Sequence, residues 1–200
     1  MRRIATPATS NRRPGRSERV SSGKPYSSVA AEAAKQTLQQ FLAAYPHSWL
    51  LVEARKAGAP KNMLFDTIAP SAAMTADALN PALLRISDAD VRSQPQNYEL
   101  HALSKSPRNP WTDRILIGRA ANNDVVLLNP SVSKVHAYLV LGSGTAQIFS
   151  YETRNPTKVG ATTALPNGPG VNVADGADLQ IGVLRTRYLS GTLLYKLMRP

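Results

Sequence analysis

The sequence has no cysteine and no long apolar run. The absence of cysteine among 200 residues excludes disulfides and thiolate metal sites. The three histidines lie far apart in the sequence and lack the spacing of metal ligands, so neither a metal nor another cofactor is expected. No apolar stretch approaches the roughly 20 residues that a membrane-spanning helix needs.

Acidic residues are also scarce, numbering 13 against 24 lysines and arginines, for a formal net charge of +11. Residues 1–27 hold seven basic residues and one acidic residue, residues 28–107 hold seven of each, and residues 108–200 hold ten and five. Both ends of the chain therefore attract anions. Nucleic acid, acidic proteins and phosphorylated segments all fit this charge, and charge alone does not choose among them.

The first zone, residues 1–27, is rich in Arg, Ser, Pro and Gly. It holds too few apolar side chains to offset the entropy of ordering, which predicts a disordered basic arm. The same composition also matches an organellar transit peptide. No apolar segment follows the first arginines, so a secretory signal is not expected. The protein is therefore expected to be cytoplasmic.

The second zone, residues 28–97, reads as an N-terminal extension that packs on or leads into the following domain. Apolar residues three to four positions apart predict one helix from Ser28 to Tyr45, with Ser28 as its N-cap. Residues 48–53 predict a short strand, and residues 63–68 a second strand that pairs back as a hairpin. No catalytic or ligand-binding constellation is present in this zone.

The third zone, residues 98–200, consists of short β-rich runs that recur about every ten residues between turn residues. This spacing is typical of an all-β sandwich or barrel. The predicted strands are 98–103, 114–117, 125–128, 137–141, 146–149, 158–159, 171–173, 179–183, 188–189 and 193–197.

The loops between these runs carry polar groups that suit a phosphorylated ligand. Arg119 follows a strand and a glycine, Ser133 stands beside Lys134, and Asn155 lies in a later loop. A guanidinium, a hydroxyl and an ammonium can hold a dianionic phosphate, and an amide can hold a peptide unit beside it. Ser133 and His136 could also form a nucleophile and its base, but no third group orients the histidine and no nucleophile elbow surrounds the serine. The chain is therefore not expected to be an enzyme.

In order and spacing, these segments resemble the forkhead-associated (FHA) domain family. The resemblance covers about residues 98–198 and implies an antiparallel two-sheet β-sandwich, here expected over residues 98–200, that binds phosphothreonine peptides with loops at one end. The helix and hairpin upstream resemble extensions in some bacterial FHA proteins, so a bacterial source is expected. The matching segments are Ile117–Arg119, Asn123–Leu127, Ser133–Ala137, Thr153–Val159 and Asp175–Gly182.

The resemblance assigns the phosphate contacts to three residues. Arg119 matches the family's phosphate-binding arginine, Ser133 the serine whose hydroxyl touches the phosphate, and Lys134 the basic residue beside it. Gly118 is expected to let the backbone turn tightly before the arginine.

The resemblance also assigns the neighbouring positions. Asn155 matches the asparagine that binds the ligand backbone, and His136 matches a structural histidine that braces the loop. Thr157 matches the family's threonine and is expected either to contact the phosphopeptide or only to support the loop. The family usually has glycine after the asparagine, whereas this chain has Pro156. Proline fixes φ near −65° and removes an N–H, so a reshaped loop is expected.

The implied function is a phosphothreonine-dependent adaptor in Ser/Thr kinase signalling. Its partner would be a phosphothreonine-containing protein, either a Ser/Thr kinase or its substrate. Two alternatives stay open: an FHA-fold scaffold that binds its partner independently of phosphate, suggested by Pro156, and nucleic-acid binding through the basic arm. The second lacks an aromatic-interleaved basic patch or a helix-turn-helix pattern in the sequence.

Overall fold

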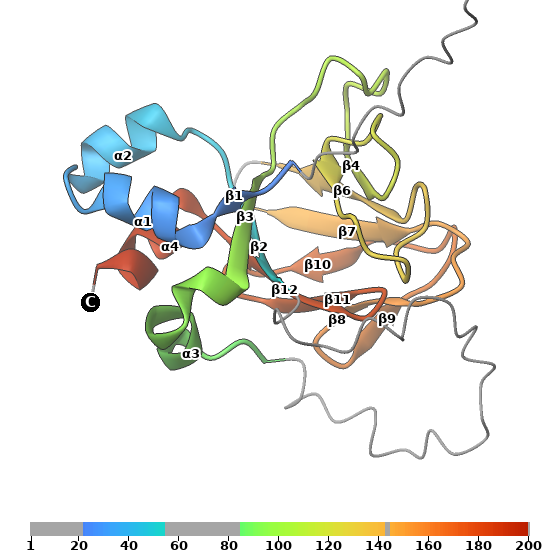
Figure 1. Ribbon diagram of the computed structural model, residues 1–200. Coiled ribbons are helices and arrows are strands. Elements are labelled where there is room, and N and C mark those ends of the chain that lie inside the picture. The colour runs from blue at the N-terminus through green and yellow to red at the C-terminus, as the bar shows by residue number, and fades with distance from the viewer. Residues whose placement is uncertain (1–21, 55–84, 143–144, 200) are drawn as a thin grey trace, which may run out of the picture.

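The computed structural model describes residues 22–54, 85–142 and 145–199. In these residues a β-sandwich carries a group of helices on one side (Figure 1). The strands are β1 (Lys24–Pro25), β2 (Trp49–Glu53), β3 (Tyr98–Ala102), β4 (Ile115–Gly118), β5 (Val125–Val126), β6 (Ala137–Leu141), β7 (Ala146–Ser150), β8 (Thr157–Val159), β9 (Thr162–Ala164), β10 (Val171–Val173), β11 (Asp178–Ile181) and β12 (Leu184–Leu189). The helices are α1 (Tyr26–Ala33), α2 (Leu38–Ala44), α3 (Asp88–Ser93), the short 3-10 helix η4 (Pro95–Asn97) and α4 (Gly191–Met198).

The strands of the described residues form two sheets. The 7-stranded sheet has the order β1-β3-β2-β12-β11-β8-β9, and the 5-stranded sheet has the order β10-β7-β6-β4-β5. The predicted mainly-β sandwich is confirmed. One pairing departs from the antiparallel prediction, because β5 lies parallel to β4.

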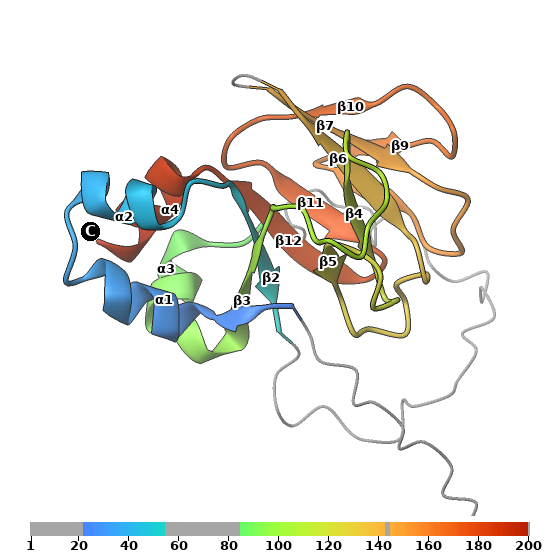
Figure 2. The same ribbon diagram turned by 90° about the horizontal axis from the view of Figure 1, so that it is seen from above.

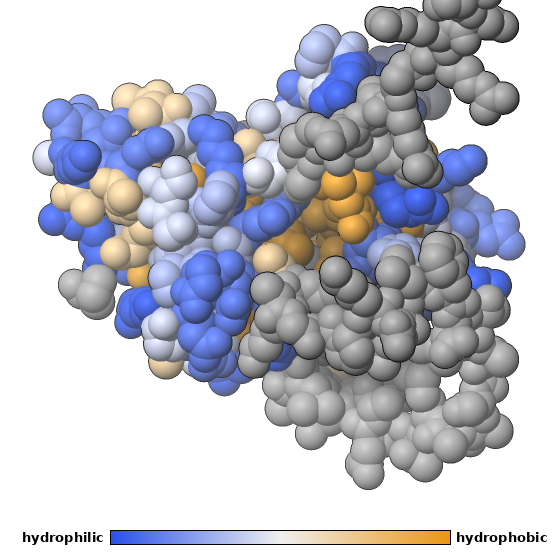
Figure 3. Space-filling view, viewed as in Figure 1, coloured by the Kyte–Doolittle hydropathy of each residue, from blue (hydrophilic) through white to orange (hydrophobic). Residues whose placement is uncertain are grey.

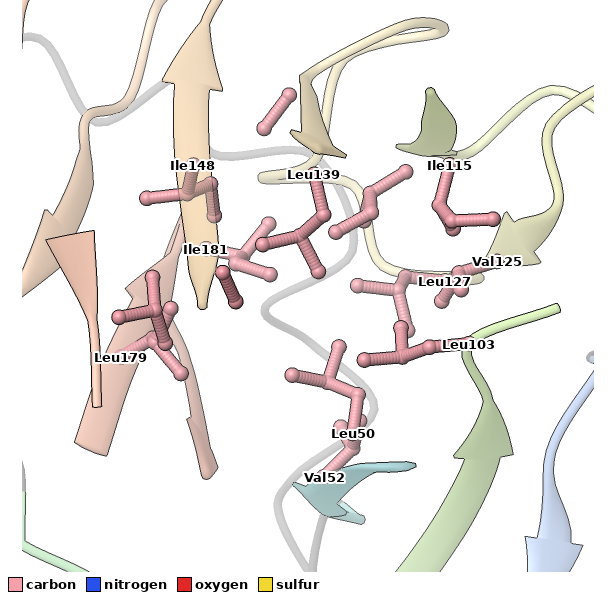
Figure 4. Close-up of a cluster of buried hydrophobic side chains, with 14 of the residues drawn as sticks. Leu50, Val52, Leu103, Ile115, Val125, Leu127, Leu139, Ile148, Leu179 and Ile181 are labelled. Carbon is pink, nitrogen blue, oxygen red and sulfur yellow. The ribbon is translucent and has the colours of Figure 1, made fainter. Parts of the chain in front are cut away.

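One hydrophobic core fills the space between the two sheets (Figure 4). Strands of both sheets alternate inward and outward side chains, as half-buried strands do. In β6, for example, Ala137 and Leu139 are buried while Tyr138 faces outward. Burial of one aliphatic side chain of this kind contributes about 1.5–3 kcal/mol. Ten of the residues that meet in this core are labelled in Figure 4: Leu50, Val52, Leu103, Ile115, Val125, Leu127, Leu139, Ile148, Leu179 and Ile181.

A second core lies between the other face of the 7-stranded sheet and the helices (Figure 2). Strand β2 is buried on both faces, because Leu50 and Val52 enter the first core while Trp49 and Leu51 enter the second. This explains why its sequence is a continuous apolar run and not an alternating one. The surface over α3 is hydrophilic, whereas apolar residues are visible at the centre of the same view, over the sandwich (Figure 3).

The predicted helix from Ser28 to Tyr45 is wrong in its continuity, since two helices replace it. Helix α1 begins at Tyr26 after Pro25, so Ser28 is not its N-cap. Helix α2 begins after Thr37. The Thr37 hydroxyl accepts from the backbone N–H of Gln40, and the side-chain oxygen of Gln40 accepts from the backbone N–H of Thr37. This capping box starts a new helix, which a spacing of apolar residues does not reveal.

The predicted strand at residues 193–197 is also wrong, because these residues belong to helix α4. The Ser190 hydroxyl accepts from the Leu193 amide at 3.1 Å and caps the helix. Leu194 and Leu197 are then buried on one face, three positions apart. A short run of apolar residues fits either period, and the capping serine decides between them.

Part of the predicted disordered arm is ordered. Lys24 and Pro25 pair with β3 at the edge of the 7-stranded sheet, and Tyr26 is only 3% exposed. The predicted strand at residues 63–68 and its hairpin lie outside the described residues. The other strand predicted in the extension, β2, is confirmed and pairs with both β3 and β12.

Candidate functional site

The site begins where β4 ends and the chain meets the loop before β6. The amide of Arg119 donates to the Ser133 carbonyl at 2.9 Å, and the amide of Ala120 donates to the Lys134 carbonyl at 3.0 Å. The two segments therefore run side by side. These bonds bring together the three residues predicted to contact phosphate.

Gly118 permits this close approach. A Cβ atom at Gly118 would lie 2.4 Å from the Lys134 carbonyl oxygen and 2.9 Å from Asn123 Nδ2. Its φ is not positive, since the positive-φ glycines of the described chain are Gly160, Gly176 and Gly182. The expected tight turn is thus not the reason for this glycine; the reason is that no side chain fits between the two segments.

Two cations stand at this junction. The Arg119 Nε donates to the Val132 carbonyl at 3.1 Å, which is the one hydrogen bond that its side chain makes to the rest of the described chain. The terminal Nη groups therefore remain available, and the side chain of the neighbouring Lys134 is exposed. Neither cation pairs with a carboxylate among the described residues. Two unpaired cations side by side have the chemistry to hold an anion.

His136 supports the loop that carries Ser133 from the interior of the fold. It is fully buried, and its Nδ1 accepts from the Ser133 amide at 3.1 Å. Burial lowers the pKa of His136, although the Pro156 carbonyl acts in the opposite direction. The ring is therefore neutral at pH 7, with its proton on Nε2.

The contact between His136 and Ser133 involves the serine backbone and not its hydroxyl. The Ser133 hydroxyl makes no hydrogen bond to the part of the chain that the structure describes. A serine activated as a nucleophile needs its hydroxyl within reach of the base. This arrangement offers instead a free hydroxyl beside two cations.

A second loop meets the first at Ser131. The Asn155 Nδ2 donates to the Ser131 carbonyl at 2.9 Å, and the Thr153 hydroxyl donates to the Asn155 carbonyl at 2.7 Å. One amide N–H and the side-chain oxygen of Asn155 stay free of hydrogen bonds to the described residues. Asn155 is half-buried, so these groups can still meet a peptide backbone.

The β11–β12 turn completes the assembly. The amide of Val183 donates to the Ser131 hydroxyl at 3.0 Å, and the amide of Gly182 donates to the Pro156 carbonyl at 3.2 Å. Gly182 has φ +65°, and a Cβ there would lie 2.6 Å from the Ser131 hydroxyl. The peptide bond of Pro156 is trans. The Pro156 carbonyl therefore joins the Asn155 loop to the β11–β12 turn.

Thr157 lies outside the surface that a ligand can touch. Its side chain is 0% exposed, and its hydroxyl lies 3.4 Å from that of Ser150. As the first residue of β8, Thr157 points into the sandwich. The predicted ligand contact at Thr157 is thus not available in this structure, and the threonine supports the loop from within.

The motifs assigned no individual role to Asn123 and Asp124, yet both residues shape the site. The Asn123 Nδ2 donates to the carbonyls of Ala120 and Lys134, both at 2.7 Å, and ties the Arg119 loop to the lysine. Asp124 is buried and accepts from the Leu116 amide at 2.7 Å. The signal available in the sequence was an acidic residue placed directly before an apolar strand.

Asp124 also fixes the loop between β3 and β4. Its carboxylate accepts from the Ser106 amide at 2.6 Å, from Asn109 Nδ2 at 2.5 Å and from Lys105 Nζ at 3.4 Å. These donors are distant in sequence from the aspartate, and a buried carboxylate is stable only when paired and hydrogen-bonded. Asp124 therefore holds this loop against the strand that leads to Arg119.

The described residues show neither a metal-binding cluster nor a membrane helix. No group of at least three His, Cys, Asp or Glu residues is placed to hold a metal ion in the described ranges. No helix in the same ranges is long and apolar enough to cross a membrane.

The fold and the site together define a class: a two-sheet β-sandwich that presents a cationic, hydroxyl-bearing loop cluster at one end. Residues 115–182 match the model of the FHA domain. This part of the chain is therefore identified as an FHA domain, as the motifs predicted. FHA domains are interaction modules. No curated protein matches the chain.

Several solved structures are similar to parts of the chain. EmbR of Mycobacterium tuberculosis, solved with a low-affinity phosphopeptide, is 22% identical over 45% of this chain and 21% of its own, with a TM-score of 0.37. The FHA domain of CT664 from Chlamydia trachomatis is 14% identical over 72% and 97%, with a TM-score of 0.41. The MEK1 FHA domain, solved with the HOP1 pThr318 peptide, is 16% identical over 39% and 80%, with a TM-score of 0.33. The chain thus spans about a fifth of the length of EmbR.

Proposed function

We propose that this chain is a phosphothreonine-dependent protein-binding module. The observation that carries the proposal is the state of Arg119: its Nε is fixed on the Val132 carbonyl at 3.1 Å while its terminal nitrogens stay available. The free Ser133 hydroxyl and the exposed Lys134 lie beside it. An oriented guanidinium gives short, charge-assisted hydrogen bonds to phosphate oxygens at a small entropic cost.

The residues divide the work between phosphate and peptide. Arg119 and Lys134 supply positive charge, and the Ser133 hydroxyl donates to a phosphate oxygen. The free N–H and oxygen of the Asn155 amide bind a peptide unit next to the phosphothreonine. His136, through the Ser133 amide, keeps this loop in place. No step of bond making or breaking is involved, so the proposal is for a binding module and not for an enzyme.

The partner is a protein phosphorylated on threonine by a Ser/Thr kinase, either the kinase itself or its substrate, met in the cytoplasm. The binding unit extends upstream of residue 98, because β2 of the extension lies between β3 and β12. A fragment that starts at residue 98 lacks this central strand, so the full chain is the appropriate material for binding experiments.

The test measures binding of a degenerate phosphothreonine peptide library, with phosphoserine and unphosphorylated controls, to the full chain and two variants. Arg119→Ala removes charge-assisted hydrogen bonds worth about 1.5–3 kcal/mol, so its affinity should fall about 10- to 150-fold. Arg85→Ala is the matched control, because Arg85 is an exposed arginine beside α3. It should bind like the wild type.

Equal binding of phosphorylated and unphosphorylated peptides would overturn the proposal and favour a scaffold that ignores phosphate. Equal losses in Arg119→Ala and Arg85→Ala would show attraction by net charge alone, as expected for nonspecific binding of polyanions such as nucleic acid.

A further inference from the structure

The strands of the 5-stranded sheet contain no charged residue. Their sequences are ILIG in β4, VV in β5, AYLVL in β6, AQIFS in β7 and VNV in β10. Strands of the 7-stranded sheet carry Lys24, Glu53, Lys158, Arg185 and Arg187, among others. A chain with a net charge of +11 thus keeps one whole sheet neutral.

The outer face of this sheet is aromatic. Tyr138 and Phe149 are cross-strand partners on β6 and β7, and their rings stack with centroids 4.7 Å apart and planes 3° apart. Tyr151 lies against Tyr138 at 5.4 Å. A Cβ at Gly170 would lie 2.5 Å from the Phe149 ring, so glycine is needed where the chain passes this ring. Outer faces of antiparallel sheets usually carry polar side chains, whereas this face combines stacked rings with the amides of Gln147 and Asn172.

The aromatic row continues past the edge of β6. The Arg114 guanidinium lies over the Tyr138 ring at 4.7 Å and over the Trp111 ring at 4.9 Å. Its charge is balanced by Asp113, whose carboxylate it binds at 2.7 and 3.0 Å. Trp111 is 53% exposed. We call the row of Trp111, Arg114, Tyr138, Phe149 and Tyr151 the aromatic strip.

The described chain covers the strip only in part: the segment at Gly170 contacts the Phe149 ring and Arg114 lies over Tyr138, while Trp111 is 53% exposed. The helices pack against the 7-stranded sheet, on the far side of the sandwich from this face (Figure 2). Beside the strip, the exposed amides of Gln147 and Asn172 bond to each other at 3.0 Å and leave further donors and acceptors toward solvent. Aromatic residues and arginine with few other charges are the composition of the centre of a protein interface.

We propose that this face binds a second copy of the chain and forms a weak symmetric dimer. Two copies that each carry +11 repel one another wherever charged surfaces meet. The sheet face, whose strands carry no charge, avoids this repulsion. It is self-complementary, because amides can hydrogen-bond to amides and aromatic rings can stack on aromatic rings. Single-stranded nucleic acid would also stack on aromatic rings, but it needs cations along the groove, and these strands supply none.

The size of the face sets the strength of the dimer. The five strands have two to five residues each, so at about 3.3 Å per residue and about 4.8 Å between strands they cover no more than roughly 19 by 17 Å. The patch is smaller than the roughly 800 Å² per partner of a stable complex, even with Trp111 and Tyr151 at its rim. The dissociation constant of the dimer should therefore lie in the upper micromolar range or above.

The test follows the mass of the unphosphorylated full chain by sedimentation velocity from about 10 μM to about 1 mM. The wild type should show a concentration-dependent rise toward the dimer. Gln147→Lys places a charge on each copy at the interface and should raise the dimer Kd at least about tenfold. Gln39→Lys, on the exposed face of α2, adds the same charge elsewhere and should leave the Kd unchanged.

Amide NMR shifts on dilution locate the contact, and they should be confined to β6, β7, β10 and the Trp111 loop. A monomer up to the highest concentration overturns the proposal. Equal effects of Gln147→Lys and Gln39→Lys, or shifts on the helices, also overturn it. Arg119→Ala should dimerise like the wild type, so failure of the phosphopeptide site and failure of the dimer are distinguishable.

Discussion

Replacing Asp124 with asparagine should destabilise the fold far more than the same change at a nearby exposed aspartate. The Asp124 carboxylate is 0% exposed and takes four donors, from Ser106, Leu116, Asn109 and Lys105. Asparagine keeps one acceptor oxygen and turns an NH₂ group toward donors that then lack a partner. Removing one member of such a buried charged network costs about 3–5 kcal/mol.

Asp113→Asn is the matched control. Asp113 is 59% exposed and pairs with Arg114 at 2.7 Å. Exposed pairs contribute about 0–1 kcal/mol, so the control should stay within this range. Urea unfolding followed by far-UV circular dichroism gives both free energies of unfolding. A loss below about 1 kcal/mol for Asp124→Asn, or equal losses in both variants, would refute the view that this carboxylate holds the β3–β4 loop.

Three further predictions concern single positions. Gly118→Ala should lose about 1–3 kcal/mol of unfolding free energy and weaken phosphopeptide binding, because its Cβ would clash with the Lys134 carbonyl; unchanged urea midpoint and affinity would contradict this. Ser190→Ala should lose about 1 kcal/mol through loss of the α4 cap, measured in the same assay, and a neutral effect would count against the cap. Burial lowers the pKa of His136, and burial together with Lys24 lowers that of His47, from the ordinary value of 6.5. The folded state therefore favours the neutral histidines, so the free energy of unfolding from urea titrations should be highest above about pH 7 and fall toward pH 5. The fall should be less steep in His136→Asn, and a flat wild-type profile would contradict the prediction.

The part of the site near Arg119 could be predicted because it is local in sequence. Each of Gly118, Arg119 and Ser133 follows or precedes a predicted strand, so the residue types and the loop positions were both visible. The hydrogen bonds that join the Arg119 and Ser133 segments became visible only in the structure. They agree with the loop positions that the spacing of the predicted strands had given. The family resemblance added the loop of Asn155, which spacing alone would not have joined to the others.

Other features depended on which way a side chain points or on distant partners. Thr157 was predicted at the surface, but the two-residue period of β8 turns it inward. Three of the four donors to Asp124 come from the β3–β4 loop, whose sequence gives no sign of a distant carboxylate partner. The run from Leu193 to Leu197 fits a strand or a helix, and only the cap at Ser190 separates the two. The aromatic strip could not be predicted, because Trp111 and Phe149 are connected only through Arg114 and Tyr138, which the sheet brings together.

The position of β2 has a consequence for synthesis of the chain. Glu53 on β2 and Arg185 on β12 form an ion pair across 132 positions of sequence. Strand β2 is synthesised early but cannot pair with β12 until the end of the chain has been synthesised. Pairings between strands so distant in sequence form slowly. Until then Trp49, Leu50 and Leu51 are exposed as an apolar run that other nascent chains can pair with. We therefore expect the newly made chain to rely on chaperones more than its size suggests.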